Sequence, residues 1–370
     1  MGDTWDAIIV GAGPAGSVAA LELKRAGIPK VLLVDKSRFP RRKVCAGGLG
    51  PRSRKILEEM GLWEEIFPLA YPIRGARIVT NKGKPLRLSG VESAAVLPRS
   101  EFDSLLANKA VEAGAIFRDS TRVVGLRREG ERVRGILLED GTTEEVTDRG
   151  IVIAANGANT AFNPSRGRGG YLATAMAWFE DLPFEANHLE LIFDSRTAPH
   201  YLWIFPEGDT RVNVGTAVFY HHLEGRKIMD LFDEVLTENL GDRLAGATET
   251  GRRRSFPITG SRFVRIPERP GLLCIGEAAR LVNLFTGEGI PYALESGRTA
   301  ARVIASAFSG AHGAGRKTLG RQLEGSLRRT LGASLFSGQL LCSVGHPLLN
   351  TAGYLCKFNA VKRAVSSAFS

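Results

Sequence analysis

Features of metal centres, disulfide-stapled domains and membrane proteins are missing from the sequence. The four cysteines among its 370 residues are widely separated and form no CxxC pair, so their spacing predicts neither a metal site nor a dithiol centre. No apolar run approaches the roughly 18 residues of a membrane span. The first residues, MGDTWD, carry acids where a secretory signal would be basic. We therefore expect a cytoplasmic protein without bound metal.

Acidic residues are also fewer than basic ones. The chain has 49 lysines and arginines against 39 acids, a formal net charge of +10, and the excess lies in clusters such as SRFPRRK and GRRRSF. Such clusters attract anionic lipid, nucleic acid or phosphate-bearing substrates, and solvated faces of a basic protein are the alternative. Because no nucleic-acid-binding motif accompanies the charge, we expect no nucleic acid partner.

Residues 6–37 have the pattern of a strand, a glycine turn, a helix and a second strand. Gly11, Gly13 and Gly16 form GxGxxG between strand and helix, where this motif binds a dinucleotide. Gly11 permits the tight turn, Gly13 lets a pyrophosphate approach, and Gly16 lets the helix pack closely. The helix N-terminus adds partial positive charge. Asp35 ends the second strand, where a carboxylate binds the adenosine ribose, so we expect NAD or FAD.

The rest of the chain alternates between two kinds of pattern. Residues 73–95 and 166–265 are strand-like, with aromatic-rich runs that predict an inserted antiparallel sheet for substrate binding. An apolar strand and a helix return within 266–306, so the nucleotide-binding domain is expected to be discontinuous: 1–72, 96–165 and 266–306. Residues 307–370 have a helical, basic pattern. The predicted class is α/β plus antiparallel β, with a Rossmann-like domain, an inserted sheet domain and a helical C-terminal segment.

Four further motifs lie outside the first glycine turn. They are PRSEFD, with Arg99 and Asp103; GEAARLVNLFTGEGI, with Glu277; FPRRKVCAGGL; and YLWIFP followed by GTA. Together they resemble the geranylgeranyl reductase family of FAD-dependent oxidoreductases, in the aromatic-hydroxylase-like superfamily. This resemblance implies noncovalently bound FAD. Three positions depart from the family pattern: aspartate is usual at Glu277 and Asn156 and glycine at Ala217, and Asn156 is assigned no role.

The resemblance also implies which residues contact FAD. Glu277 is expected near the ribityl and pyrophosphate groups, and the TGEGI turn near the flavin, where a helix N-terminus stabilises negative charge on the reduced ring. Arg99 is expected at a phosphate or ribityl group, with a surface salt bridge as the alternative. The expected cofactor contacts are Gly11, Gly13, Pro14, Ala15, Gly16, Asp35, Lys36, Arg42, Cys45, Ala46, Gly47, Arg99, Gly276, Glu277, Gly287, Gly289 and Ile290.

The aromatic motif predicts a substrate-binding wall. Alternation along one strand puts Tyr201, Trp203 and Phe205 on a single face, where they line a pocket for an isoprenoid chain or form ordinary sheet core. Together with Pro206 and Gly48, they are the expected substrate contacts.

Cys45 lies in the loop RRKVCAGGLGPRS, which the family resemblance places beside the flavin. Its thiol is a candidate catalytic group, and packing is the alternative. Gly47 and Gly48 let the backbone approach the ring, and the neighbouring basic residues Arg41, Arg42 and Lys43 are near enough to meet a phosphate or a charged substrate head.

The resemblance implies an FAD-dependent reductase that saturates C=C bonds of a prenyl chain on a lipid, pyrophosphate, quinone or secondary metabolite. A flavin monooxygenase acting on an aromatic or terpenoid substrate is the alternative. Because no second GxGxxG occurs in a strand–helix context, the electron donor is expected to be transiently bound NADPH or a ferredoxin. The C-terminal segment, with apolar patches and basic residues, is expected to close the tunnel, touch a membrane peripherally or pack on the core.

Overall fold

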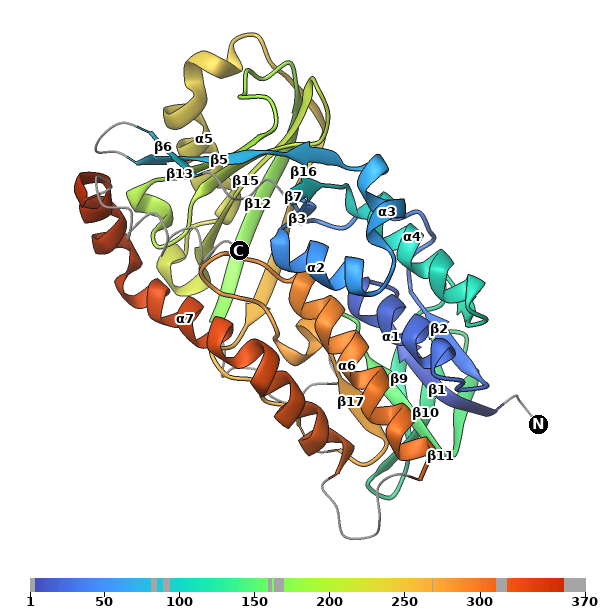
Figure 1. Ribbon diagram of the computed structural model, residues 1–370. Helices are drawn as coiled ribbons and strands as arrows, with labels where there is room; N and C mark the ends of the chain where they lie inside the picture. Colours follow the sequence, from blue (N-terminus) through green and yellow to red (C-terminus); the bar gives the residue numbers. More distant parts are fainter. Residues whose placement is uncertain are drawn as a thin grey trace.

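The computed structural model describes residues 4–80, 85–88, 94–158, 162, 170–267, 269–310 and 318–355, and of 343–355 it describes the backbone alone. These residues form three β-sheets with helices between and around them (Figure 1). Two of the sheets have seven strands each, and the third has three.

The first sheet carries the nucleotide-binding pattern. Its path is β8-β2-β1-β11-β10-β9, with β17 paired to β11. The strands β1, β2, β8, β11 and β17 are parallel neighbours, whereas β9 and β10 form an antiparallel hairpin that continues into β11. Their bounds are β1 Thr4–Val10, β2 Val31–Val34, β8 Ile116–Arg118, β9 Val123–Glu129, β10 Arg132–Leu138, β11 Thr143–Ala154 and β17 Leu272–Cys274.

The second sheet is antiparallel except for one pair. Its order is β16-β12-β15-β14-β13-β5-β6, and β13 pairs with β5 in parallel, which differs from the uniformly antiparallel sheet predicted. The reason is the connection: β5 and β13 are joined through much of the first sheet, and only such a long crossover permits parallel pairing. The bounds are β5 Gly75–Thr80, β6 Leu86–Leu88, β12 Gly170–Glu180, β13 His188–Phe193, β14 Leu202–Pro206, β15 Arg211–Phe219 and β16 Thr248–Gly260.

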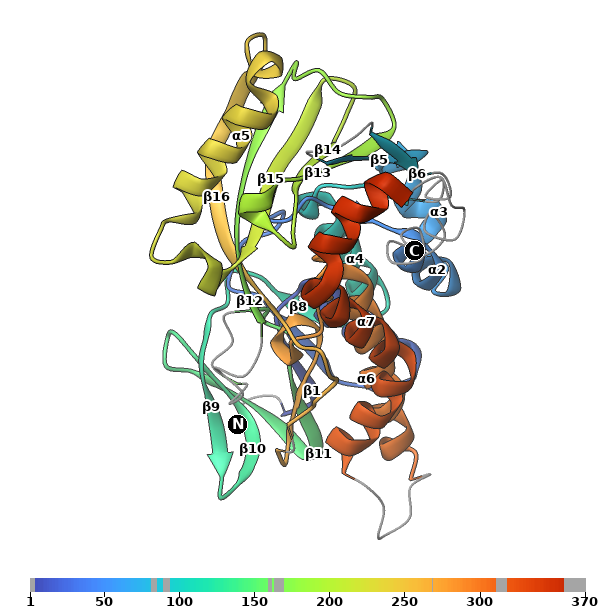
Figure 2. The same cartoon turned by 90° about the vertical axis from the view of Figure 1, so that its left-hand side faces the viewer.

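The two faces of this second sheet have different neighbours. Helix α5 (Ile228–Leu244) covers one face, where Leu202 and Ile204 join its apolar cluster. Helix α7 (Leu319–Leu355) lies on the other side, and its Cys342 packs in the apolar cluster of that face (Figure 2). Alternate residues of one strand therefore pack in two different apolar clusters, one on each face of the sheet.

A small third sheet joins the two large ones. It has the order β3-β7-β4, with β3 Gly48–Leu49, β4 Tyr71–Ile73 and β7 Ala94–Val96. Helices α2 (Pro51–Glu59) and α3 (Trp63–Ile66) follow β3, and α4 (Arg99–Glu112) follows β7. The short helical turns are η1 Phe67–Leu69, η2 Ser195–Thr197, η3 Tyr220–Leu223 and η4 Gly276–Ala279.

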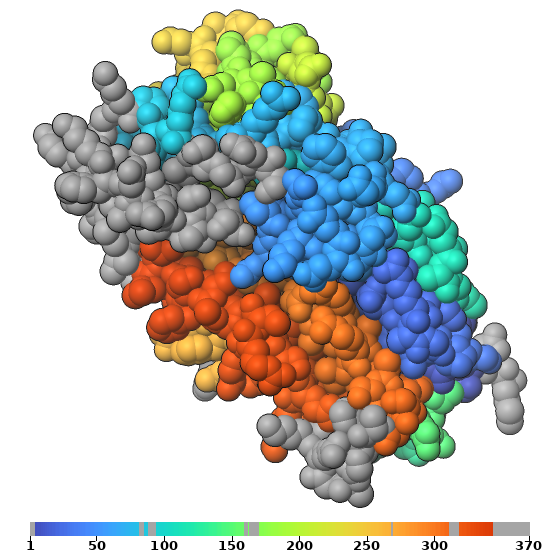
Figure 3. All heavy atoms as spheres, in the orientation of Figure 1, coloured from blue at the N-terminus to red at the C-terminus, as the bar shows by residue number. Residues whose placement is uncertain are grey.

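Helix α7 packs along α6 (Ile290–Phe308), and on the face in Figure 3 they lie beside α2. Four leucines of α7 at a spacing of four residues are buried in the main core, which is the stripe of an amphipathic helix: Leu323, Leu327, Leu331 and Leu335. Among the described helices, none has the length and hydropathy needed to cross a bilayer.

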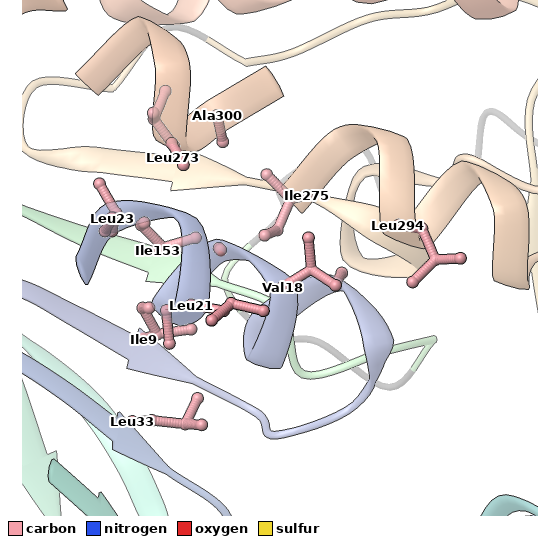
Figure 4. Packing of buried hydrophobic residues seen from close by; sticks show 14 of the residues in the cluster. Ile9, Val18, Leu21, Leu23, Leu33, Ile153, Leu273, Ile275, Leu294 and Ala300 are labelled. Carbon is pink, nitrogen blue, oxygen red and sulfur yellow. The ribbon is translucent and has the colours of Figure 1, made fainter. Parts of the chain in front are cut away.

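The main core is built around α1 (Pro14–Arg25), which packs against α4 and α6. Its buried residues Val18, Leu21 and Leu23 lie between the first sheet and α6 (Figure 4). The partners shown from the sheet and from α6 are Ile9, Leu33, Ile153, Leu273, Leu294 and Ala300. This packing fixes the N-termini of α1 and α6, on which the site depends.

Candidate cofactor and substrate site

The first glycine turn has the geometry of a phosphate-binding turn. Gly11 has φ +106°, and a Cβ there would lie 2.5 Å from the carbonyl oxygen of Ala155. A Cβ on Gly16 would lie 1.9 Å from the carbonyl oxygen of Gly11, so neither position accepts a side chain. Gly13 is the N-cap of α1, and no described side chain caps this helix end. Its free N–H groups are available to an anion.

Two arginines flank this turn. At Gly13 an added Cβ would have only the Nη2 atoms of Arg41 and Arg99 as near neighbours among the described residues, each at 3.6 Å. Arg99 forms a bidentate pair with Asp103, with bonds of 2.6 and 2.8 Å, and Arg41 lies 3.0 Å from the same carboxylate. Burial opposes the charge on Arg99, but Asp103 outweighs it and raises the pKa of Arg99. Two arginines share this buried carboxylate, and both guanidinium groups lie near Gly13 at the helix N-terminus.

Asp35 stabilises the first glycine turn through hydrogen bonds to backbone N–H groups. Its Oδ2 accepts a hydrogen bond from Ala12 N at 2.9 Å, and its Oδ1 accepts one from Ser37 N at 2.9 Å. Arg41 Nε lies 3.6 Å from Oδ2. The side chain is buried at the end of β2, as the dinucleotide pattern requires. Contact of Asp35 and of the exposed Lys36 with a ribose stays a prediction.

A second group of residues faces the same turn from η4. Glu277 Oε1 accepts a hydrogen bond from Thr259 N at 3.0 Å, and burial raises the pKa of its carboxyl. Lys43 is its main cationic neighbour, and burial, with Arg99 and Arg41 nearby, lowers the pKa of Lys43 to about 8. Gly276 has φ +57°, and a Cβ there would lie 2.8 Å from the Cβ of Ala15. The two predicted cofactor segments therefore meet.

The N-terminus of α6 is the second uncapped helix end in the site. Gly289 is the N-cap, Ile290 is the first helical residue, and no side chain of the described residues caps it. Gly287 has φ +71° and open space around it among those residues. Near the first turn, Asn156 Oδ1 is buried and has no partner in the part of the chain that the structure describes.

These features together fit FAD. Two uncapped helix N-termini and two arginines suit an anionic cofactor, and the orphaned Asn156 oxygen is an acceptor that a bound ligand would satisfy. The residues that would hold the pyrophosphate are Gly13, Arg41 and Arg99, and those beside the flavin would be Gly287, Gly289 and Ile290. The structure brings Arg41 rather than the predicted Arg42 to this cluster; Arg42 is exposed, and its guanidinium lies near Gly251.

The loop that carries Cys45 lies between the two large sheets. Gly47 has φ +73°, and a Cβ there would lie 2.4 Å from the carbonyl oxygen of Leu97. A Cβ on Gly48 would lie 2.9 Å from the ring of Phe205. The two glycines therefore let this loop fit between β7 and the aromatic strand β14.

Successive side chains of this loop pack in two different apolar clusters. Val44 and Ala46 pack in the apolar cluster of the second sheet, whereas Cys45 packs against the main core. Gly47 N donates to the Cys45 sulfur at 3.4 Å, and Arg99 donates to the same sulfur. The thiol thus faces the cofactor cations rather than the aromatic wall, and its catalytic role stays a prediction.

Tyr201, directly before β14, shares one apolar cluster with Trp203 and Phe205 of this strand, as their alternation predicts. The Tyr201 hydroxyl donates to the carbonyl oxygen of Thr286 at 2.6 Å, and Trp203 Nε1 donates to Asn213 Oδ1 at 2.7 Å. Trp203 lies over Gly215, where a Cβ would come within 2.3 Å of its ring. Phe205 and the buried Pro206 complete the strand. The wall is joined to the cofactor side through Thr286 and Gly48.

A cavity of about 1200 Å³ is lined by residues of β12, β15, β16, η3 and α7 rather than by the three aromatic residues themselves. Leu172, Phe219 and Cys342 line it and belong to the same apolar cluster as Trp203. The remaining lining includes four basic or imidazole side chains of the segment that joins β15 to α5: His221, His222, Arg226 and Lys227. The cavity was not predicted, because its walls come from strands and a helix far apart in the sequence.

Comparisons with known proteins agree with this geometry. The FAD binding domain family matches residues 4–320. Menaquinone reductase of Mycolicibacterium smegmatis is 32% identical over 326 residues, which cover 81% of this chain and 76% of the relative. Digeranylgeranylglycerophospholipid reductase of Methanocella arvoryzae is 29% identical over 352 residues, which cover 90% of this chain and 86% of the relative.

A solved structure from Thermoplasma acidophilum, described as geranylgeranyl bacteriochlorophyll reductase-like, superposes with a TM-score of 0.79 and 25% identity. The match covers 92% of this chain and 88% of that one. The fold is therefore the FAD-binding flavoprotein fold with mixed α/β sheets. The chain belongs to the geranylgeranyl reductase family of FAD-dependent oxidoreductases.

Proposed function

We propose that this protein is an FAD-dependent reductase that saturates C=C bonds of a prenyl chain. The observation that carries the proposal is the junction between the aromatic wall and the cofactor loops: Tyr201 bonds to Thr286 of the TGEGI turn, and Phe205 lies against Gly48. An apolar chain lying on this wall would meet the flavin-side loops directly. Two relatives are named as reductases of menaquinone and of a digeranylgeranylglycerophospholipid, both molecules with isoprenoid chains.

An isolated double bond is a poor hydride acceptor, so the protein must position it closely and exclude water. FAD, when bound and reduced, supplies the hydride. The uncapped N-terminus of α6 would stabilise negative charge on a flavin ring bound beside it. The aromatic wall and the cavity of about 1200 Å³ supply the apolar surface, and this volume exceeds the roughly 300–1,000 Å³ of most small-molecule pockets, which suits a long chain.

Basic side chains in the cavity lining favour an anionic head group. Arg226 and Lys227 line the cavity together with two histidines. A prenyl pyrophosphate or a prenylated phospholipid would place its phosphate there while the chain runs along the apolar side. The electron donor, NADPH or a ferredoxin, and peripheral contact with a membrane stay predictions.

Anaerobic turnover tests the proposal. The purified protein is loaded with FAD, reduced chemically without oxygen, and mixed with prenyl pyrophosphates, prenylated phospholipids and menaquinone. We expect products heavier by one hydrogen molecule for each saturated bond, measured by mass spectrometry. Failure with every prenyl substrate, together with oxygen-dependent hydroxylation of an aromatic or terpenoid compound, would establish the monooxygenase instead. A protein that neither holds nor rebinds FAD would contradict both.

A further inference from the structure

Glu288 occupies a fixed position in the TGEGI turn. It stands between Gly287 and Gly289, directly before α6. Its backbone N–H donates to Thr286 Oγ1 at 3.3 Å, and the same hydroxyl donates to its Oε2 at 3.3 Å. Its carbonyl oxygen accepts from Asn283 N at 3.0 Å. Three hydrogen bonds therefore hold the backbone and carboxyl of Glu288 at the flavin-side end of the turn.

The same turn anchors the aromatic wall. Thr286, whose hydroxyl bonds to Glu288, accepts through its carbonyl oxygen the hydrogen bond of Tyr201. The carboxyl thus lies where the expected flavin site meets the expected substrate wall. Among the described residues, the charged and titratable groups that face Glu288 from neighbouring elements are Arg52 of α2, Tyr201 directly before β14, and Tyr292 of α6.

The acidity of Glu288 suits proton transfer at neutral pH. Burial raises the pKa of its carboxyl to about 7, although Arg52 and the Thr286 hydroxyl act in the opposite direction. A general acid works best when its pKa lies near the working pH. Burial also raises the pKa of Tyr201, which makes it a weaker acid, and lowers that of His200 to about 4, which leaves it neutral.

The other candidate proton donors, Cys45 and Glu277, do not contact the turn that anchors the aromatic wall. The Cys45 sulfur accepts a hydrogen bond from Arg99 beside the first glycine turn. Glu277 has Lys43 as its main cationic neighbour and bonds to Thr259. Both therefore lie with the cations of the expected pyrophosphate site, whereas Glu288 is joined through Thr286 to the aromatic wall.

We propose that Glu288 is the general acid of the reaction, which rests on the proposed function. One alkene carbon gains the hydride that reduced FAD supplies, and the other gains the proton of the Glu288 carboxyl. The π bond breaks and two C–H bonds form. The positive charge of Arg52 stabilises the carboxylate that remains, which then takes a proton from water.

The variant Glu288→Gln keeps the shape of the side chain and its acceptor for Thr286 but removes the acidic proton. We expect unchanged FAD stoichiometry and a loss of about 10²-fold or more in the rate of alkene reduction, since a general acid contributes about 10²–10⁴-fold. Glu288→Asp should recover part of the rate with a shifted pH profile. Glu58→Gln is the matched control, because Glu58 lies on the surface of α2 in a pair with Arg54, and we expect it to retain the wild-type rate.

A second readout does not depend on turnover. Infrared spectra of the FAD-loaded wild type, recorded across neutral pH, should show a protonated carboxyl band that titrates near pH 7 and is missing from Glu288→Gln. This measurement also decides the case if the glutamine variant does not fold, because a wild type without a carboxyl that titrates near neutrality contradicts the proposal.

Glu288→Gln with the wild-type rate and pH profile would overturn the assignment of Glu288 alone. A wild type that reduces no prenyl substrate would overturn the proposed function itself. The two failures are therefore distinguishable.

Discussion

Replacing Asp103 by asparagine tests the charge balance beside the first glycine turn. The Asp103 side chain is fully buried, and the side chains of Arg99 and Arg41 that pair with it are only 9% and 13% exposed. Asparagine keeps the shape but leaves the poorly hydrated Arg99 without its carboxylate, and leaves Arg41, among the described residues, with Asp35 alone, 3.6 Å away. Removing one partner of a buried ion pair costs about 3–5 kcal/mol, a large part of the roughly 5–15 kcal/mol that stabilises a typical domain.

Bound FAD should recover part of the stability that Asp103→Asn loses. Its pyrophosphate would supply negative charge where Asp103→Asn has removed it, so the variant should bind FAD at least as tightly as the wild type. At about 100 times the dissociation constant, a ligand raises the free energy of unfolding by about 2.7 kcal/mol. We therefore expect the stabilisation of the variant by FAD to equal or exceed that of the wild type.

Urea unfolding followed by tryptophan fluorescence, with and without FAD, measures both effects. Glu58→Gln is the control, because Glu58 pairs with Arg54 at the surface, where the side chains are 44% and 37% exposed and the pair contributes at most about 0.5 kcal/mol. If Asp103→Asn without FAD lost no more stability than this control, the buried cation pair would not have the energetic role inferred from its geometry.

Three further predictions follow from the site. Burial lowers the pKa of Lys43 from 10.5 to about 8, so between these pH values the unfolded chain binds more protons than the folded one. The free energy of unfolding of the wild type should therefore rise from pH 8 to 10.5 relative to that of Lys43→Met. If urea titrations gave both proteins the same dependence on pH, this prediction would be wrong. Gly48→Ala should retain FAD but reduce prenyl turnover by about tenfold or more, since its Cβ would lie 2.9 Å from the Phe205 ring; Phe205→Leu in the same chain should restore part of the rate, and no restoration would count against a steric cause. Arg226→Glu with Lys227→Glu should raise KM for prenyl substrates with anionic heads at low ionic strength and leave neutral ones unchanged; equal effects on both would exclude a charge contact.

Local patterns predicted much of the site. The glycines at 11, 13 and 16 and the alternating aromatics of β14 are fixed by requirements within a few residues, namely a tight turn and a two-residue period. Sequence could not choose between Arg41 and Arg42, because loop backbone decides which of two adjacent side chains turns inward. The structure turns Arg41 toward Asp103 and leaves Arg42 exposed.

Long-range contacts account for what was missed. Pairing of β5 with β13 joins segments more than a hundred residues apart, and no local pattern specifies it. The TGEGI pattern predicts cofactor contacts for Gly287 and Gly289 but no role for Glu288 between them. Its acidity depends on burial among Arg52, Tyr201 and Tyr292, which come from three separate elements.

The order in which the first sheet is assembled bears on how the protein is made. β1 and the first glycine turn leave the ribosome about 270 residues before β17, Glu277 and α6. A nascent chain therefore carries half of a cofactor site while this intervening part is made, and α1 has no α6 to pack against until then. FAD loading would wait for α6, and free FAD in the cell would act on a chain that already contains both halves of the site.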